Sequence, residues 1–146
     1  MYTGVIILNY NSADETINCI QSIEKYNSSP IKYIIVDNGS SDHNGINFIK
    51  SYIAQLSTPH IILNESEPSP KELPYITFLI SNQNDGYAIG NNKGLNLAYS
   101  DKSIDSLLII NNDVLFTEDL IPSFLDFYHN NPECGILSPL LLTSES

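Results

Sequence analysis

Along this chain, short continuous apolar runs alternate with longer segments in which apolar residues recur every three or four positions. The continuous runs have the length and composition of strands buried on both faces. They lie at residues 4–8, 33–36, 60–63, 75–80 and 106–110, and a further strand is expected to begin at 135–137. The segments with helical spacing predict helices. These lie at about residues 13–25, 46–56, 87–99 and 118–128.

Strands that alternate with helices predict parallel β-α-β units with right-handed crossovers. We therefore expect an α/β fold, a three-layer α/β/α sandwich with a mostly parallel central sheet. The length of 146 residues suits a single domain that spans residues 1–146. Residues 64–74, rich in Glu, Ser and Pro, interrupt the alternation and are expected to form an exposed loop.

Polar residues follow every strong strand. Taken singly, clusters of Asn, Asp, Gly and Ser are typical of turns. Together they suggest a ligand site, because the carboxyl ends of parallel strands meet at one edge of a sheet and ligands bind there. The clusters are Asn9-Tyr10-Asn11-Ser12, Asp37-Asn38-Gly39-Ser40, residues 82–86 and Asn111-Asn112-Asp113.

The residue types in these clusters suit different parts of a nucleotide. A buried carboxylate at Asp37 can accept an N–H from a pyrimidine or an O–H from ribose. Tyr10 can pack flat against a base while its hydroxyl stays in water. Asp113 is placed to hold Mg²⁺ or Mn²⁺, which prefer oxygen ligands and often bridge substrate phosphates. Asn111 can assist as a neutral ligand, whereas Asn112 is expected to point to the opposite side.

Charge narrows the choice of ligand. The net charge of −11 argues against nucleic acid as a partner. All six basic residues are lysines, so no guanidinium is there to bind a phosphate in the bidentate mode. A phosphorylated ligand must then be held by backbone N–H groups, by a lysine or through a metal ion.

Several other kinds of site are not indicated. The sequence has no GxxxxGK[ST], GxGxxG or GxSxG motif, which disfavours a P-loop, a dinucleotide-binding fold and a hydrolase. Cys19 and Cys134 lie far apart and are expected to be reduced and buried, in agreement with a cytoplasmic protein. His43, His60 and His129 have no metal-ligand spacing and are expected at the surface. Neither a signal peptide nor a membrane span is predicted.

Four motifs carry a resemblance to a known family. They are residues 5–12 (VIILNYNS), 36–42 (VDNGSSD), 84–94 (NDGYAIGNNKG) and 108–114 (LIINNDV). Together they resemble the family 2 glycosyltransferases with the GT-A fold. The asparagine-rich forms of these motifs are most similar to the rhamnosyltransferase-like branch. The four motifs occur in the family's order and extend over nearly the whole chain.

The resemblance implies an inverting, metal-dependent transfer of a sugar from a UDP- or dTDP-sugar to a glycan or lipid-linked acceptor, as in polysaccharide biosynthesis. The implied cofactor is Mg²⁺ or Mn²⁺. Asn111 and Asp113 match the outer positions of the family's metal-binding DxD motif. The residues implied to bind the nucleoside diphosphate sugar are Asn9, Tyr10, Asn11, Asp37, Asn38, Gly86, Asn92, Lys93 and Asn112.

The chain also departs from the family pattern. Asn111 stands where the family has the first acid of DxD, and Asn91 stands where many relatives have arginine. The family's catalytic domain continues into an acceptor half that carries the base which deprotonates the acceptor. We expect that half and its base beyond residue 146, so the chain should bind a donor but transfer sugar inefficiently. Apolar surface left without that half would favour a homo-oligomer.

Other interpretations fit the sequence less well. A nucleotidyltransferase would carry a glycine-rich basic loop after the first strand, which residues 9–12 do not form. A receiver-like signalling domain would need paired acids there, whereas Asp14 and Glu15 begin a helix. A non-catalytic nucleotide-sugar-binding module stays open, because Asn111 removes one charge from the metal site. The donor sugar, its base (uridine or deoxythymidine) and the acceptor also stay open.

Overall fold

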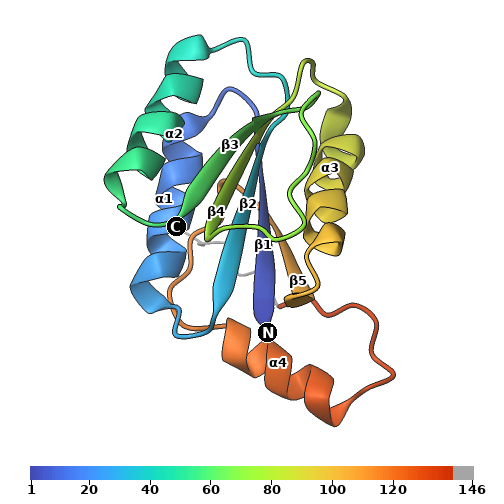
Figure 1. The fold of residues 1–146 in the computed structure, drawn as a ribbon. Helices are drawn as coiled ribbons and strands as arrows, with labels where there is room; N and C mark the ends of the chain where they lie inside the picture. Colours follow the sequence, from blue (N-terminus) through green and yellow to red (C-terminus); the bar gives the residue numbers. More distant parts are fainter. Residues whose placement is uncertain (140–146) are drawn as a thin grey trace.

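The computed structural model describes residues 1–139. Within this range the strands and helices occur in the predicted order (Figure 1). The elements are β1 (Tyr2–Asn9), α1 (Ala13–Tyr26), β2 (Ile31–Asp37), α2 (His43–Gln55), β3 (His60–Asn64), β4 (Ile76–Ile80), α3 (Gly86–Ser100), β5 (Ile104–Asn111) and α4 (Ile121–Asn130). No helix within residues 1–139 is both long enough and apolar enough to cross a membrane.

One parallel sheet forms the middle layer of the molecule. Its strand order is β3-β4-β2-β1-β5, and every neighbouring pair is parallel. Helices α1 and α2 cover one face of the sheet, and α3 covers the other (Figure 1). This arrangement confirms the predicted three-layer α/β/α sandwich. In the described residues the sheet is wholly parallel.

The two faces of the sheet bury alternate residues of the same strands. In β1, Val5 and Ile7 pack toward α1 and α2, whereas Ile6 packs toward α3. All three side chains are fully buried, because helices cover both faces. This double burial explains why the strands occur in the sequence as continuous apolar runs and not as an alternating pattern.

Helix α3 approaches the sheet closely at Gly94. A Cβ atom at this position would lie 2.8 Å from Cγ2 of Ile6 and 3.2 Å from Cγ2 of Val36. The helix therefore reaches this distance from β1 and β2 only because Gly94 has no side chain. Burial of Leu97 and Ala98 against the sheet then stabilises a segment whose intrinsic helix propensity is low.

Two predictions for residues beyond 115 are wrong. Helix α4 begins at Ile121 and not at 118. A helix from 118 would have placed Pro122 beyond its first turn, where proline removes a helical hydrogen bond and clashes with the preceding turn. Residues 135–137 form no strand. Ile136 is 90% exposed, and no described strand pairs with this segment, so it lacks the partner that a strand requires.

The cysteines and histidines lie largely where they were expected. Both cysteines are free; Cys19 is buried, whereas Cys134 is only half-buried. His43, His60 and His129 are exposed.

A buried ion pair joins the elements at the amino-terminal edge of the sheet. Nζ of Lys32 lies 2.8 Å from Oδ2 of Asp101, and the two side chains are 7% and 2% exposed. Asp101 also accepts hydrogen bonds from the backbone N–H of Leu73 and from the N–H and hydroxyl of Ser103. Burial alone would raise the pKa of Asp101, but Lys32 and these donors hold it well below its usual range. The pair thus links β2 to the loop before β4 and the loop before β5.

The close approach at Gly94 gives a first test of this packing. Gly94→Ala is expected to lower the free energy of unfolding by about 1–3 kcal/mol, because the added methyl group overpacks the interface between α3 and the sheet. Asn96→Ala, at an exposed position of the same helix, is the matched control and is expected to be neutral or stabilising. Urea unfolding measures both variants. Equal stability of the two would contradict the packing assigned to Gly94.

The buried ion pair predicts a pH-dependent stability. Asp101→Asn is expected to lower the free energy of unfolding at neutral pH by about 3 kcal/mol, because Lys32 is left buried without a counter-charge. The folded pKa of Asp101 is depressed, so its stabilisation is present above the unfolded pKa of about 3.9 and is lost as the pH falls through the folded value.

The difference between wild type and Asp101→Asn should therefore shrink as the pH falls below about 4. Asp105→Asn, at an exposed position of β5, is the control and is expected to change stability little at either pH. Urea unfolding at neutral and acidic pH provides the measurement. A loss of the same size at both pH values would contradict the assigned ion pair.

Candidate functional site

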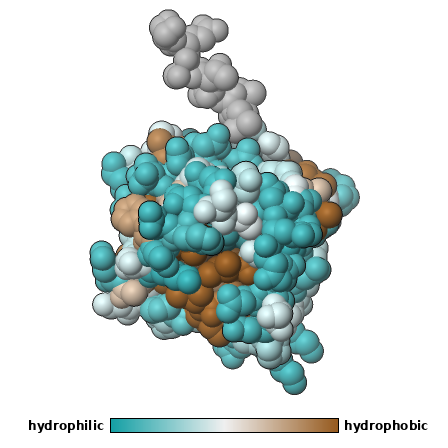
Figure 2. Space-filling view, turned by 90° about the horizontal axis from the view of Figure 1, so that it is seen from above, coloured by the Kyte–Doolittle hydropathy of each residue, from teal (hydrophilic) through white to brown (hydrophobic). Residues whose placement is uncertain are grey.

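The parallel sheet brings the polar clusters together at its carboxyl-terminal edge. In the register of the sheet, Asp37 of β2 pairs with Asn9 of β1 and with Ile80 of β4. On the other side of β1, Asn111 of β5 pairs with Leu8. Figure 2 looks down on this edge and shows a mainly hydrophilic surface around an apolar patch. The polar clusters therefore share one edge, as the sequence predicts.

Asp37, the last residue of β2, is a buried hydrogen-bond acceptor at the centre of this edge. Its side chain is fully buried. Oδ1 accepts hydrogen bonds from Nδ2 of Asn9 at 2.8 Å and from Oγ of Ser40 at 2.6 Å. Oδ2 accepts one from the backbone N–H of Ser40 at 3.0 Å. Three donors are thus directed at the side chain of Asp37. A carboxylate can only accept hydrogen bonds, so any further partner must also be a donor.

Asn9 supports Asp37 through its side-chain amide. It is 1% exposed. Its Nδ2 donates to Asp37, and its Oδ1 accepts from Oγ1 of Thr16 at 2.8 Å. Both ends of the amide are thereby occupied. By contrast, Tyr10 is 47% exposed, and Asn11 is exposed with a φ of 52°. Tyr10 and Asn11 therefore form the accessible surface of this cluster, while Asn9 orients Asp37.

The turn after β2 is joined to the start of α3. Gly39 has a φ of +69°, and a Cβ there would collide with the backbone of Gln83, so the turn requires glycine. Asn38 is 2% exposed. Its Nδ2 donates to Oδ1 of Asn84 at 2.9 Å and to the backbone O of Gly86 at 3.2 Å. These contacts place Gly86, the first residue of α3, beside the end of β2.

A pocket of about 340 Å³ lies among the ends of β2, β3 and β4 and the first part of α2. Its volume falls within the range of small-molecule sites. Its wall includes Asp37, His43, Lys50 and Ser81. Only Asp37 among these was predicted as a site residue. No motif marks the other three, and their place beside Asp37 follows from how α2 and β4 pack next to β2.

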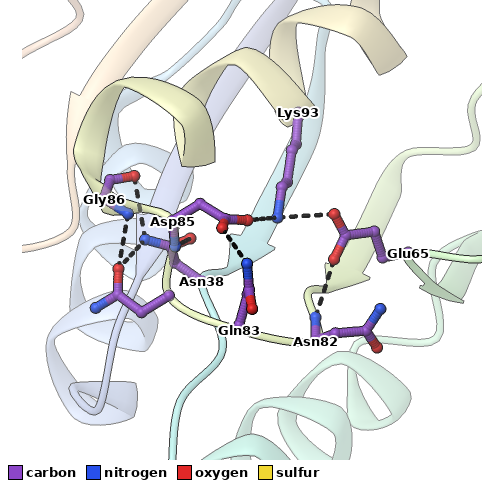
Figure 3. A network of polar contacts seen from close by, with 8 residues as sticks. Asn38, Glu65, Asn82, Gln83, Asp85, Gly86 and Lys93 are labelled. Atoms are coloured by element: carbon purple, nitrogen blue, oxygen red, sulfur yellow. Dashed lines mark hydrogen bonds and ion pairs between the residues drawn. The ribbon is translucent and has the colours of Figure 1, made fainter.

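Lys93 on α3 is held by two carboxylates (Figure 3). Its Nζ lies 2.7 Å from Oδ2 of Asp85 and 2.8 Å from Oε1 of Glu65. Burial acts to lower the pKa of Lys93, but the two carboxylates outweigh it and raise that pKa. Glu65 also accepts the backbone N–H of Asn82 at 3.0 Å. The lysine predicted to lie near phosphate thus joins α3 to the ends of β3 and β4, while the neighbouring Asn92 is exposed.

The side chains at the end of β5 alternate between solvent and the protein. Asn111 and Asp113 are exposed, whereas Asn112 is half-buried. Nδ2 of Asn112 donates to Oγ of Ser12 at 2.6 Å and to Oγ1 of Thr16 at 3.1 Å. Asn112 therefore turns toward α1, but not through the extended backbone that was expected. Asn112 and Asp113 lie in a turn, in which the N–H of Val114 donates to the backbone O of Asn111 at 3.2 Å. The amide of Asn112 joins β5 to the start of α1.

Asn111 and Asp113 offer one amide oxygen and one carboxylate for a cation. Within the described residues, no group of three or more His, Cys, Asp or Glu side chains could hold a metal by itself. The pair nevertheless suits Mg²⁺, which proteins often bind through one or two carboxylates together with substrate phosphates. Cys19 of α1 is fully buried, and burial, and to a lesser degree Asp113, raises the pKa of its thiol to about 12.

The role of Asn9 as the support of Asp37 can be tested by an isosteric change. Asn9→Asp places a second buried carboxylate against Asp37 and is expected to lower the free energy of unfolding at neutral pH by about 3 kcal/mol. Repulsion raises the pKa of one carboxyl of the pair in the folded state, so the loss is expected to shrink as the pH falls toward about 4.

Asn18→Asp, at an exposed position of α1, is the control for Asn9→Asp and is expected to leave stability nearly unchanged. Urea unfolding across this pH range measures both. A pH-independent loss in Asn9→Asp would contradict the direct contact between Asn9 and Asp37.

Comparison with known proteins agrees with this arrangement. Residues 4–139 match the family model described as Glycosyl transferase family 2. No curated protein matches the chain. The matched region contains the carboxyl-terminal ends of all five strands of the described sheet and the polar residues that follow them. This chain therefore belongs to glycosyl transferase family 2.

Proposed function

We propose that this chain supplies the donor site of a metal-dependent, inverting glycosyltransferase of the rhamnosyltransferase-like branch. The donor is a UDP- or dTDP-sugar, and the acceptor is a glycan or a lipid-linked molecule. The observation that carries this proposal is the fully buried Asp37 carboxylate at the wall of a pocket on the carboxyl-terminal edge of the sheet. Membership of glycosyl transferase family 2 supports the class of reaction.

The nucleoside is proposed to bind over the ends of β1 and β2. Oδ2 of Asp37 accepts one hydrogen bond, from a backbone N–H, and so retains a lone pair for an N–H of the base or an O–H of the ribose. Tyr10 is exposed and offers its ring for stacking. Asn11, also exposed, offers polar groups to the ribose. Asn9 and Asn38 contribute indirectly, by holding Asp37 and the turn after β2.

The diphosphate is proposed to lie toward the end of β5, where Asp113 and Asn111 would hold Mg²⁺ or Mn²⁺. When bound, the ion would supply positive charge to the departing diphosphate. Apart from Lys50 in the wall of the pocket, the protein itself offers little such charge. Its net charge is −11, it has no arginine, and Lys93 is paired with Asp85 and Glu65. Asp113 is therefore proposed to carry the largest share of donor affinity that depends on a cation.

The start of α3 is proposed to flank the diphosphate from the other side. The first N–H groups of a helix point away from it without internal partners and favour anions. Gly86 is the first residue of α3, and Asn38 holds it beside the end of β2. Asn92 is exposed on the same helix. The N–H of Gly86 already donates to Oδ1 of Asn84 at 2.9 Å. We therefore propose that the next N–H groups of the first turn and the side-chain amide of Asn92 contact the donor.

Sugar transfer also requires a base that takes the proton of the acceptor hydroxyl, so that the oxygen can attack the anomeric carbon with inversion. Several carboxylates at this edge are already engaged. Asp37 accepts three hydrogen bonds, and Asp85 and Glu65 both bind Lys93. These three are therefore not proposed as the base, which we assign to the acceptor half that the resemblance to the family implies. The chain alone is proposed to bind a donor without efficient transfer.

Calorimetric titration of UDP and dTDP, with and without Mn²⁺, tests the donor site. Mn²⁺ is expected to tighten binding at least about tenfold, which corresponds to about 1.4 kcal/mol. Asp113→Ala is expected to abolish that gain, because it removes the carboxylate of the cation site. Asp126→Ala, which removes an exposed carboxylate of α4, is the control and is expected to bind as the wild type does.

Each alternative outcome has a distinct meaning. Equal affinity for UDP and dTDP with and without Mn²⁺ would contradict the proposed metal site but would still support the donor site. No binding of either nucleotide would contradict the donor site. It would favour a non-catalytic module that has kept the family fold, an interpretation that Asn111 supports because it stands in place of the first acid of DxD.

A further inference from the structure

Thr16 of α1 carries a hydroxyl that lies between the two halves of the proposed donor site. The residue is fully buried. The hydroxyl has one proton, and of its two acceptors Oδ1 of Asn9 is the nearer, at 2.8 Å against 3.1 Å for the backbone O of Ser12. The same oxygen accepts a hydrogen bond from Nδ2 of Asn112 at 3.1 Å. One hydroxyl is therefore shared by the end of β1 and the turn after β5.

The contact with Asn9 leads to Asp37. Nδ2 of Asn9 donates to Oδ1 of Asp37 at 2.8 Å, while Oδ1 of Asn9 accepts from Thr16. Asn9 is 1% exposed, so the loss of this donor would leave a buried carbonyl oxygen without it. An amide that is held at one end only can rotate and release its partner. Thr16 therefore determines which end of the Asn9 amide faces Asp37.

The contact with Asn112 leads to the turn that carries Asn111 and Asp113. Asn112 lies between these two exposed residues and is itself half-buried. Its Nδ2 donates to Thr16 and, at 2.6 Å, to Oγ of Ser12. These contacts fasten the turn to α1. Residues that hold the ligands of a metal from behind set the orientation of those ligands and change the affinity for the metal.

We propose that Thr16 is a positioning residue for both halves of the donor site: its hydroxyl holds Asp37 through Asn9, and the turn with Asn111 and Asp113 through Asn112. This inference rests on the proposed function and goes beyond it, because Thr16 itself contacts neither the donor nor the cation. Helix α1 thereby sets the position of the nucleoside end of the site relative to its cation end.

Calorimetric titration of UDP and dTDP, first in EDTA and then with Mn²⁺, measures the two halves separately. The affinity in EDTA reports on the Asp37 half, and the factor by which Mn²⁺ tightens binding reports on the turn after β5. Thr16→Val replaces the hydroxyl by a methyl group of similar size. It is expected to lower each quantity about two- to tenfold, the range for one neutral hydrogen bond. Thr16→Ser keeps the hydroxyl and is expected to retain both.

Two control variants separate positioning from stability. Thr77→Val makes the same chemical change at another fully buried threonine, whose hydroxyl has no partner among residues 1–139. Asp101→Asn destabilises the fold from the amino-terminal edge of the sheet, away from the donor site. Both controls are expected to bind as the wild type does in EDTA and with Mn²⁺. Circular dichroism at the temperature of the titration verifies that each variant is folded.

Asn112→Ala removes the link toward β5 and keeps the proposal falsifiable if Thr16→Val does not fold. The variant is expected to lower the factor by which Mn²⁺ tightens binding. In the double variant, Thr16→Val is expected to lower that factor no further, because the two residues act through one contact. An undiminished effect of Mn²⁺ in Asn112→Ala, or additive losses in the double variant, would overturn the proposal.

Failure of this inference is distinguishable from failure of the proposed function. If Thr16→Val binds as the wild type does in both conditions, Thr16 is only part of the core, while the donor site stands. Loss of one quantity alone would overturn the joint role, and an equal loss in Asp101→Asn would assign the effect to stability. If the wild type binds neither nucleotide, or gains nothing from Mn²⁺, the donor site or its metal site fails and this inference fails with it.

Discussion

A buried carboxylate has to be surrounded by hydrogen-bond donors, and the carboxyl-terminal edge of this sheet is built around that requirement at Asp37. Asn9 of β1 and Ser40 of the turn after β2 provide the donors. Asn9 is held in turn by Thr16 of α1, which also accepts from Asn112 at the end of β5. One acceptor thus ties together β1, β2, α1 and β5. A ligand would meet a carboxylate whose orientation is already determined by the fold.

The distribution of charge follows the same logic at both edges of the sheet. At the amino-terminal edge, Lys32 forms an ion pair with Asp101. At the carboxyl-terminal edge, Lys93 forms ion pairs with Asp85 and Glu65. Both lysines therefore join secondary-structure elements. The chain has a net charge of −11 and no arginine, and besides Lys93 the pocket edge holds one further lysine, Lys50. A divalent cation is for this reason an integral part of the proposed donor site.

The fold was predictable wherever burial imposes a pattern on consecutive residues. Strands covered on both faces need continuous apolar runs, and β1, β2, β4 and β5 were located in this way. Prediction failed where structure depends on position within an element or on a distant partner. Pro122 requires the first turn of a helix, which moves the start of α4 to Ile121. The apolar residues at 135–137 have no described strand beside them and stay irregular.

By itself, the sequence determined the class of fold, the order of its elements, the gathering of Asn and Asp at strand ends, and the resemblance to the family. Only the tertiary structure decided what each polar residue does. It turned Asn9 and Asn112 inward as supports, paired Lys93 with two acids, and brought the unmarked Thr16 between Asn9 and Asn112. The physical reason is that apolar periodicity records burial along one segment. Hydrogen-bond partners, by contrast, come from segments far apart in the chain, and the strand order β3-β4-β2-β1-β5 selects them.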